Sequence, residues 1–255
     1  MEAYAGGAGV ALHLLTGEYV EEIVLNDLDS GVAAFWRAVF FDTANFLARL
    51  RRAPLTVAMW RRQRRIYSAG GADDSALGFA TFFLNRTNRS GILDGRPIGG
   101  YAQEGDWTIA ARFNRAALEA RIRRVAAYRS RVTVLQEDGV AVARRYAGVP
   151  GTFVYLDPPY IHKGERLYLD TLEWKDHKAL ARALRGRPGW FLTYDTDRRV
   201  GRDLYPDHRR ARYELAHTAG RHHAGSEFAV FAHGLDVPEL EGLGTGARFV
   251  QTRAI

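Results

Sequence analysis

Cysteine is absent from this chain of 255 residues, and its absence excludes two kinds of site. Disulfides and thiolate-bound metals both need cysteine, and a protein with neither fits a reducing cytoplasm. The histidines do not compensate, because none has the spacing of an HExxH-type zinc motif. We therefore predict no metal site, and we interpret His162 and His222-His223 as solvated surface side chains.

Long apolar runs are also absent. No stretch approaches the roughly 18 apolar residues that cross a membrane, and no basic segment followed by an apolar run opens the chain. We therefore expect no membrane association and a cytoplasmic location, in a bacterium or encoded by a phage. Hydrophobic residues still make up 47% of the chain, which suffices to bury the core of one large α/β domain.

Lysine is scarce, so arginine carries nearly all of the positive charge. The only lysines are Lys163, Lys175 and Lys178, yet the formal net charge is +7. A basic surface suits a polyanionic partner, because arginine contacts to phosphate release counterions. The same arginine-rich and alanine-rich composition also arises from a GC-rich genome, so charge alone indicates nucleic-acid binding only weakly.

What the chain does contain is an alternation of helices and strands. A glycine-rich turn at residues 2–9 runs into a helix at 10–15, and a β-rich strand at 19–25 follows. That strand ends at the acidic stretch 26–29, ahead of a helix at 32–41. This order of elements is half of a doubly wound nucleotide-binding sheet.

The alternation returns in the second half of the chain. The pattern there predicts helices at 115–128, 140–146 and 176–184, strands at 131–135, 152–156 and 190–194, and a hairpin of 212–217 with 228–232 around Gly225-Ser226-Glu227. The strand at 152–156 is short and apolar, which is typical of a buried parallel strand. We therefore predict an α/β fold with a doubly wound sheet.

The segment between these two halves has a different character. Residues 49–65 contain seven arginines and no acid, and loop signals follow. We interpret 46–111 as an inserted helical target-recognition region, 1–45 with 112–237 as the catalytic domain, and 238–255 as a frayed tail. Within the insert, four side chains suit hydrogen bonds to DNA phosphates or base edges: Asn85, Arg86, Asn88 and Arg89.

The most specific motif is Asp157-Pro158-Pro159-Tyr160, at the end of the apolar strand. Each proline keeps the residue before it out of the helical region, so the turn leaves the strand in one extended shape. The amino group of a base is a poor nucleophile, because its lone pair is delocalised into the ring. Acceptance of its two hydrogens by Asp157 and the Pro158 carbonyl would favour a tetrahedral nitrogen, and Tyr160 would stack on the flipped base. We therefore predict that these four residues are catalytic.

A second set of residues indicates a nucleotide-like cofactor. The glycine turn would let the backbone approach a ligand closely, and Asp27, roughly 20 residues further on, is placed to bind ribose hydroxyls. Asp29 is an alternative ribose ligand, or caps the next helix. Asp138, at another strand end, either accepts from an adenine amino group or caps a helix. The predicted cofactor-binding residues are Tyr4, Ala5, Gly6, Gly7, Gly9, Asp27, Asp138 and Asp157.

Taken together and in this order, these motifs resemble those of the Dam-like (D12 class) DNA adenine-N6 methyltransferases. The similar segments are the glycine turn at 4–9, the acidic stretch 26–29, residues 82–87 with Ser90-Gly91, the catalytic turn 157–160, residues 192–195 and Gly225-Ser226-Glu227. The resemblance implies a Rossmann-like sheet of seven strands with an inserted recognition region. It also implies S-adenosylmethionine as the cofactor and double-stranded DNA as the substrate.

The chain departs from the family's pattern at its start. Family members have a Gly-Gly-Lys segment and a complete first strand before the glycine turn, whereas this sequence opens at the turn, with Ala3 in place of a proline. We interpret this as a start codon assigned too late or as a truncation. Buried backbone groups without partners cost about 1–3 kcal/mol each, so a truncation predicts weaker cofactor binding.

We therefore predict a monomeric, site-specific DNA adenine-N6 methyltransferase that transfers a methyl group from S-adenosylmethionine to a flipped adenine. DNA is the expected partner, and the sequence leaves open whether a cognate restriction endonuclease is a second one. Two alternatives stay open, namely a truncated, catalytically silent DNA-binding remnant and methylation of another exocyclic amino group, cytosine N4. The recognition insert precedes the catalytic turn in the chain, and this order favours adenine.

Overall fold

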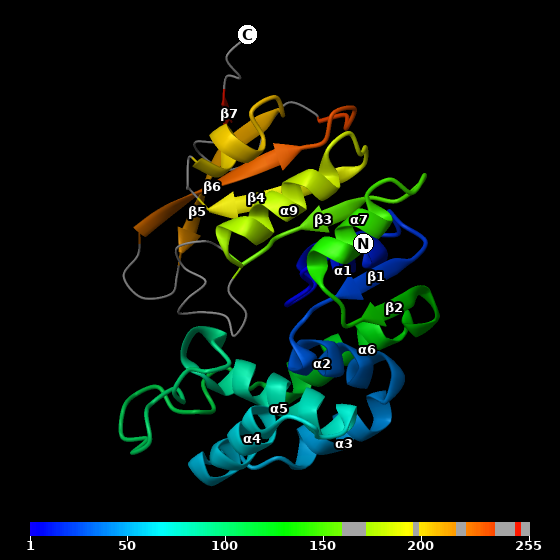
Figure 1. Ribbon diagram of the computed structural model, residues 1–255. Coiled ribbons are helices and arrows are strands. Elements are labelled where there is room, and N and C mark those ends of the chain that lie inside the picture. Colours follow the sequence, from blue (N-terminus) through cyan, green and yellow to red (C-terminus); the bar gives the residue numbers. More distant parts are fainter. Residues whose placement is uncertain (160–171, 196–198, 218–222, 238–247, 251–255) are drawn as a thin grey trace. The chain divides into compact units, whose positions relative to one another are not determined.

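A computed structural model of the chain describes residues 1–159, 172–195, 199–217, 223–237 and 248–250 (Figure 1). The protein is a mixed α/β structure that divides into two compact units. Met1–Ala11 and Glu137–Ile255 form one unit, here called the sheet unit, and Leu12–Gln136 form the other, here called the helical unit. Among the described residues, no helix has both the length and the apolarity to cross a membrane.

The sheet unit is built on five strands that hydrogen-bond in the order β3-β4-β6-β5-β7. They are β3 (Val154–Leu156), β4 (Trp190–Asp195), β5 (Arg210–His217), β6 (His223–Phe231) and β7 (Arg248–Val250). β3 and β4 are parallel, with Leu156 opposite Leu192, and the other pairings are antiparallel. Both of these leucines are fully buried, as expected for apolar strands that pair in parallel.

Residues 1–3 lie parallel to β3. The amide of Tyr155 donates to the carbonyl of Met1 at 2.8 Å, and the amide of Ala3 donates to the carbonyl of Tyr155 at 3.1 Å. Ala3 is fully buried in the core beside this strand. Because the two segments run in the same direction, the glycine turn after residue 3 lies at the same edge of the sheet as the end of β3.

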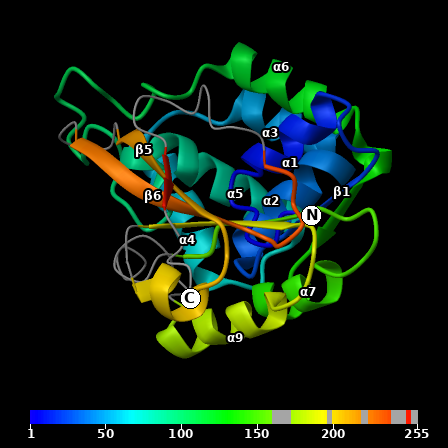
Figure 2. The same ribbon diagram turned by 90° about the horizontal axis from the view of Figure 1, so that it is seen from above.

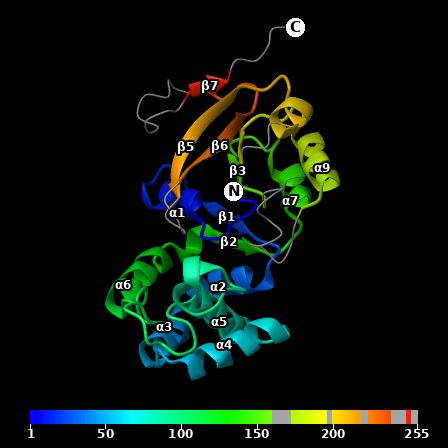
Figure 3. The same cartoon turned by 90° about the vertical axis from the view of Figure 1, so that its left-hand side faces the viewer.

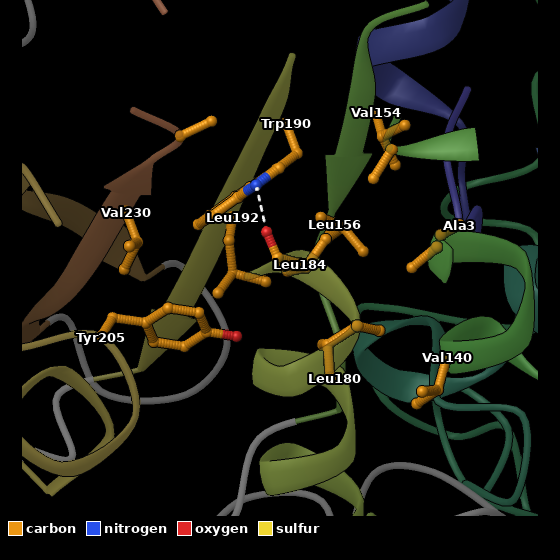
Figure 4. Close-up of a cluster of buried hydrophobic side chains, with 14 of the residues drawn as sticks. Ala3, Val140, Val154, Leu156, Leu180, Leu184, Trp190, Leu192, Tyr205 and Val230 are labelled. Atoms are coloured by element: carbon orange, nitrogen blue, oxygen red, sulfur yellow. Dashed lines mark hydrogen bonds between the residues drawn. The ribbon is translucent and has the colours of Figure 1, made fainter. Parts of the chain in front are cut away.

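Two helices cover one face of this sheet, α7 (Gly139–Tyr146) and α9 (Trp174–Leu184), and a π-helical turn follows at Val200–Leu204 (Figure 2). Helices and strands share one apolar core, drawn in Figure 4. Its labelled members are Ala3, Val140, Val154, Leu156, Leu180, Leu184, Trp190, Leu192, Tyr205 and Val230. The indole Nε1 of Trp190 donates to the Leu184 carbonyl at 3.2 Å, so burial of this ring leaves its polar atom satisfied.

The helical unit consists of helices and one pair of strands. Its helices are α2 (Ser30–Phe41), α3 (Thr43–Arg52), α4 (Val57–Ala69), α5 (Asp74–Thr87) and α6 (Arg115–Ala126), with 3-10 turns at Arg89–Gly91 and Arg129–Arg131. α1 (Gly9–Thr16) begins in the sheet unit and ends in the helical unit. The strands β1 (Ile23–Asn26) and β2 (Val132–Leu135) pair in parallel.

Helix α2 is the centre of the helical unit, because it contacts α3, α5, α6 and β2 (Figure 3). Gly78 on α5 permits a close contact with α2. A Cβ at residue 78 would lie 2.5 Å from the carbonyl oxygen of Ala34 on α2, which no other residue type could tolerate. Stacked and edge-on rings fill the space around this contact, namely Phe35, Phe46, Phe79, Phe82 and Phe113.

The order of elements predicted from the sequence is confirmed, although the strand expected at 19–25 begins only at Ile23. Glu18 has a positive φ of 57°, so the chain turns sharply after α1. The guanidinium of Arg131 then holds this turn, because its Nη2 donates to the carbonyl of Val20 at 2.7 Å. The carbonyl of Val20 is therefore bound by a side chain far along the sequence, a contact that the local pattern does not reveal.

The predicted hairpin near the C-terminus is confirmed as β5 and β6, with a different position for its glycine motif. Gly225-Ser226-Glu227 lie within β6, while the connection at 218–222 lies outside the described residues. Arg248–Val250 fall in the predicted frayed tail at 238–255, yet they form β7 by pairing with β5. The sheet thus offers these three residues backbone partners that the sequence pattern does not indicate.

Candidate active site

The catalytic turn predicted from the sequence follows β3 directly. Asp157 is exposed, Pro158 is buried and Pro159 is half-buried. The carboxylate oxygen Oδ1 of Asp157 accepts a hydrogen bond from the Thr193 hydroxyl of β4 at 2.8 Å. The turn therefore presents an anchored carboxylate to solvent at the carboxyl end of two parallel strands, where α/β sheets bind their ligands. Tyr160, the last residue of the motif, lies outside the described residues.

Two hydroxyl groups lie behind the Asp157 carboxylate. Thr193 is 4% exposed, and its Oγ1 is 3.1 Å from the hydroxyl oxygen of Tyr155 on β3. Burial, reinforced by the charge of Asp157, raises the pKa of Tyr155, so this phenol stays protonated and can donate. Sequence analysis identified Leu192-Thr193-Tyr194-Asp195 only as a family motif. Thr193 reaches Asp157 because neighbouring strands bring side chains of one face together.

The glycine turn leaves open space next to its backbone. Gly6 has a positive φ of 44°, and a Cβ built on Gly6, Gly7 or Gly9 would have no other atom within 4 Å. A ligand can therefore approach these three peptide units closely, which is the property that a nucleotide cofactor needs. The predicted cofactor turn, with buried Ala5 among its members, fits such a group.

Glu2, which sequence analysis did not single out, holds the other end of this turn. Its side chain is 4% exposed, and its Oε2 accepts a hydrogen bond from the amide of Ala11, in the first turn of α1, at 2.8 Å. Burial, aided by the charge of Asp157, raises the pKa of Glu2 to about 7. An acidic residue inside an otherwise small and apolar segment was the available sequence signal. Glu2 thus links the glycine turn electrostatically to the catalytic turn.

Tyr4 and Asp138, both predicted to bind the cofactor, are neighbours in the sheet unit. The ring of Tyr4 packs on the backbone of Gly139, the residue after Asp138. Burial, reinforced by the charge of Asp138, raises the pKa of Tyr4. The exposed carboxylate of Asp138 caps α7, because its Oδ1 accepts from the amide of Ala141 at 2.8 Å. The capping interpretation of Asp138 is therefore confirmed, while its role toward a cofactor stays a prediction.

Asp27 and Asp29 follow β1 in the helical unit. Asp27 is half-buried, and its Oδ1 accepts from the amide of Asp29 at 3.0 Å. The Oδ1 of Asp29 accepts from the amide of Gly31 at 2.7 Å, while its Oδ2 accepts from the Tyr67 hydroxyl at 2.8 Å. Asp29 is therefore the N-cap of α2, one of the two roles expected for it, and ribose binding by Asp27 stays a prediction.

The four predicted DNA-binding residues differ in how deeply their side chains are buried. Asn88 is fully buried, with its Oδ1 accepting from Trp60 Nε1 at 2.6 Å and its Nδ2 donating to the carbonyls of Ile92 and Leu93. Arg86 is half-buried, and its Nη2 donates to the carbonyl of Arg112 at 2.6 Å. These two side chains hold the chain that follows α5.

The other two members of that set, Asn85 and Arg89, are exposed. Beyond them, the loop before α6 presents two exposed aromatic rings, Tyr101 and Trp107, and the latter is 73% exposed. Gln103 fastens this loop, since its Nε2 donates to the carbonyl of Ile98 at 2.7 Å and its Oε1 accepts from the amide of Ile109 at 2.8 Å. The segment from α5 to the loop before α6 therefore exposes both hydrogen-bonding side chains and aromatic rings.

The described residues do not provide a set of side chains that could bind a metal ion. His162 and His222 lie outside the described residues, and the side chain of His223 is likewise not described. Among the residues that are described, His, Asp and Glu side chains nowhere gather in a group of three that could hold a metal ion. Near the catalytic turn, Asp157, Glu2 and Glu227 each interact electrostatically with Tyr155.

Comparison with known proteins agrees with the order of motifs. The family model of the D12 class N6 adenine-specific DNA methyltransferases matches residues 1–197, which is well over half of the chain. No curated protein matches the sequence. The matched span includes the glycine turn, the acidic stretch after β1 and the catalytic turn after β3. The chain belongs to the D12 class, and it is an S-adenosylmethionine-dependent enzyme that methylates adenine N6 in DNA.

Proposed function

We propose that the site-specific methyl transfer takes place at the catalytic turn, on an adenine flipped out of the duplex. The observation that carries this proposal is the anchored, exposed carboxylate of Asp157 at the end of β3. The hydrogen bond from Thr193 to Oδ1 limits rotation of the Asp157 carboxylate. Pro158 is buried, and the proline that follows it restricts its backbone, so the direction of the Pro158 carbonyl is fixed. Both acceptors can then meet the two hydrogens of one amino group.

The charge of Asp157 also suits the transfer itself. Adenine N6 becomes positively charged as it gains the methyl group, and a carboxylate that accepts one of its hydrogens stabilises that charge. Preorganised acceptors of this kind act most strongly because they need not reorient during the reaction. Tyr160 keeps the base-stacking role predicted from the sequence.

The cofactor is S-adenosylmethionine, which supplies an electrophilic methyl group on a sulfonium. We propose that the open backbone at Gly6, Gly7 and Gly9 holds it, with Tyr4 and Ala5 beside them and Asp138 as acceptor for its adenine amino group. Residues 1–3 support this assignment, since their pairing with β3 keeps the glycine turn at the edge that carries Asp157. Asp27 is proposed as the ribose ligand from its sequence position after β1.

We also propose a Rossmann-like catalytic domain, 1–45 with 112–237, and a target-recognition insert at 46–111. Both units contain a parallel strand pair with helices, β1–β2 in one and β3–β4 in the other, as doubly wound sheets do. The insert is helical, and its exposed Asn85, Arg89 and Trp107 are proposed to contact DNA.

Labelled methyl transfer to DNA tests the proposal. We expect Asp157→Ala to lower kcat at least a hundredfold, because one preorganised partner of the reacting group is lost. The matched control is Asp207→Ala, which removes an exposed acid of the same unit outside the site. Undiminished transfer by Asp157→Ala, or label recovered on cytosine N4, would contradict the proposed site or the proposed acceptor.

A further inference from the structure

Asp157 stands at the end of a chain of two hydroxyl groups whose direction is determined. An ionised carboxylate only accepts hydrogen bonds, so Thr193 must donate its single hydroxyl hydrogen to Asp157 across 2.8 Å. Tyr155, 3.1 Å away, must then donate to Thr193. The Leu156 carbonyl competes for the threonine hydrogen at 3.4 Å, but a shorter bond to a charged acceptor is the stronger one.

The outer member of this chain is held rigidly. The ring of Tyr155 stacks on Phe191 with centroids 5.7 Å apart, and Phe191 stacks on Phe231 with centroids 5.1 Å apart. All three residues lie on adjacent strands of one sheet, on the face opposite the core of Figure 4. Groups carried by packed strands hold a geometry better than groups on loops.

Other ionisable groups surround Asp157 on this face. Glu2 from the N-terminal segment interacts with its charge, as do Tyr155 on β3 and Tyr213 on β5. Glu227 on β6 lies next to them, with its Oε2 accepting from the Tyr213 hydroxyl at 2.9 Å. A negative charge on Glu2 disfavours one on Asp157, so a hydroxyl donor to Asp157 has an electrostatic purpose.

We propose that Thr193 and Tyr155 are positioning residues for methyl transfer, whose hydroxyl chain fixes the orientation of the Asp157 carboxylate and favours its ionised form. This rests on the proposed role of Asp157 as the acceptor of an N6 hydrogen. In this role the two hydroxyls act through Asp157, to which Thr193 donates and next to which Tyr155 completes the chain. Their loss should therefore lower the rate of the chemical step and leave cofactor affinity unchanged.

The test compares Thr193→Val, which keeps the shape but removes the hydroxyl, with Thr193→Ser, which restores it. We expect Thr193→Val to lower kcat about ten- to a hundredfold, because a small misplacement of a reacting group has effects of that order. Thr193→Ser should recover most of the rate. Tyr155→Phe should lower kcat less, and it should add nothing in the Thr193→Val background, since the chain is already broken there.

A second readout does not depend on activity. Carbon-13 NMR of the Asp157 carboxyl should show a titration midpoint about one pH unit higher in Thr193→Val than in the wild type, because a donor to the charged form is lost. Cofactor affinity measured by calorimetry should be the same in both proteins. An unchanged midpoint in Thr193→Val, or a midpoint that Thr193→Ser fails to restore, would overturn the proposal.

The same experiments separate this inference from the proposed function. If the wild type is active and Asp157→Ala keeps full activity, the role of Asp157 in catalysis is refuted, whatever the NMR midpoint shows. Loss of activity in Asp157→Ala together with full activity in Thr193→Val would refute only the hydroxyl chain. Joint loss in Asp157→Ala and Thr193→Val, with rescue by Thr193→Ser, is the result that both proposals require.

Discussion

The ring of Tyr4 lies on the backbone of Gly139, so closely that a Cβ at residue 139 would be 2.4 Å from Tyr4 Cε1 and 2.5 Å from its Cζ. Real Cβ atoms do not approach so near, and the ring is an inflexible neighbour. The contact joins the glycine turn to the first residue of α7, immediately after Asp138. The glycine turn and the start of α7 are the two segments proposed to hold S-adenosylmethionine. They can lie this close together because residue 139 has no side chain.

Gly139→Ala should therefore displace Tyr4 and weaken cofactor binding. Overpacking of this kind costs about 1–3 kcal/mol, so we expect roughly ten- to a hundredfold weaker binding of S-adenosylmethionine, measured by calorimetry. The control is Gly148→Ala, whose Cβ would meet only the flexible side chain of Arg187. Adding Tyr4→Leu to Gly139→Ala should relieve the clash, and unaltered affinity in Gly139→Ala alone would contradict this account.

Glu2 predicts a specific pH dependence of stability. Its pKa is about 7 in the folded protein against 4.5 for an ordinary glutamate, so the folded state keeps a proton that the unfolded state releases between these values. The resulting stabilisation is complete below pH 4.5 and is lost as pH rises through 7. A difference of about 2.5 pH units corresponds to about 3 kcal/mol.

Glu2→Gln removes this titration while its amide oxygen can still accept from Ala11. Urea unfolding should show that the variant gains stability relative to the wild type as pH rises from 4.5 to above 7, by up to about 3 kcal/mol. Other titrating groups cancel in the comparison, because both proteins contain them. A difference between the two proteins that stays constant with pH would show that Glu2 does not titrate in this range.

Asn88 and Asn85 should respond differently to the same substitution. Asn88→Ala leaves buried partners such as Trp60 Nε1 without a hydrogen bond, so we expect a loss of about 2–4 kcal/mol in unfolding free energy. Asn85→Ala removes only a solvent-exposed hydrogen bond to the Gly91 carbonyl, so it should change stability by less than about 0.5 kcal/mol. Chemical denaturation distinguishes the two, and equal losses would contradict the structural role of Asn88.

Trp107 should contribute to DNA binding without contributing to stability. Its ring is 73% exposed, and stacking of an aromatic ring on a base is worth about 1–3 kcal/mol. Trp107→Ala should therefore weaken DNA binding about tenfold at one fixed salt concentration, with an unchanged unfolding transition. Tyr19→Ala is the matched control, because Tyr19 is 71% exposed and lies outside the proposed insert. Equal affinities of the two variants would remove Trp107 from the DNA interface.

Several features of the candidate site could be read from local sequence. The proline pair after an apolar strand predicted the turn at Asp157, and the glycines at 6, 7 and 9 predicted open backbone before a helix. A helix cap was one of the two roles predicted for Asp29, and Asp29 is the N-cap of α2. Turns, caps and glycine positions depend on the conformational limits of a few neighbouring residues, and these limits are properties of the residues themselves.

The order of elements and the motifs at their ends were therefore determined by the sequence alone. Only the tertiary structure decided that Thr193 donates to Asp157, that Glu2 is buried beside the start of α1, and that Asn88 is enclosed under Trp60. Each of these contacts except the one made by Glu2 joins residues more than twenty positions apart. Burial and hydrogen-bond partners depend on which surfaces the packed core brings together, and residue patterns along one strand or helix do not contain that information.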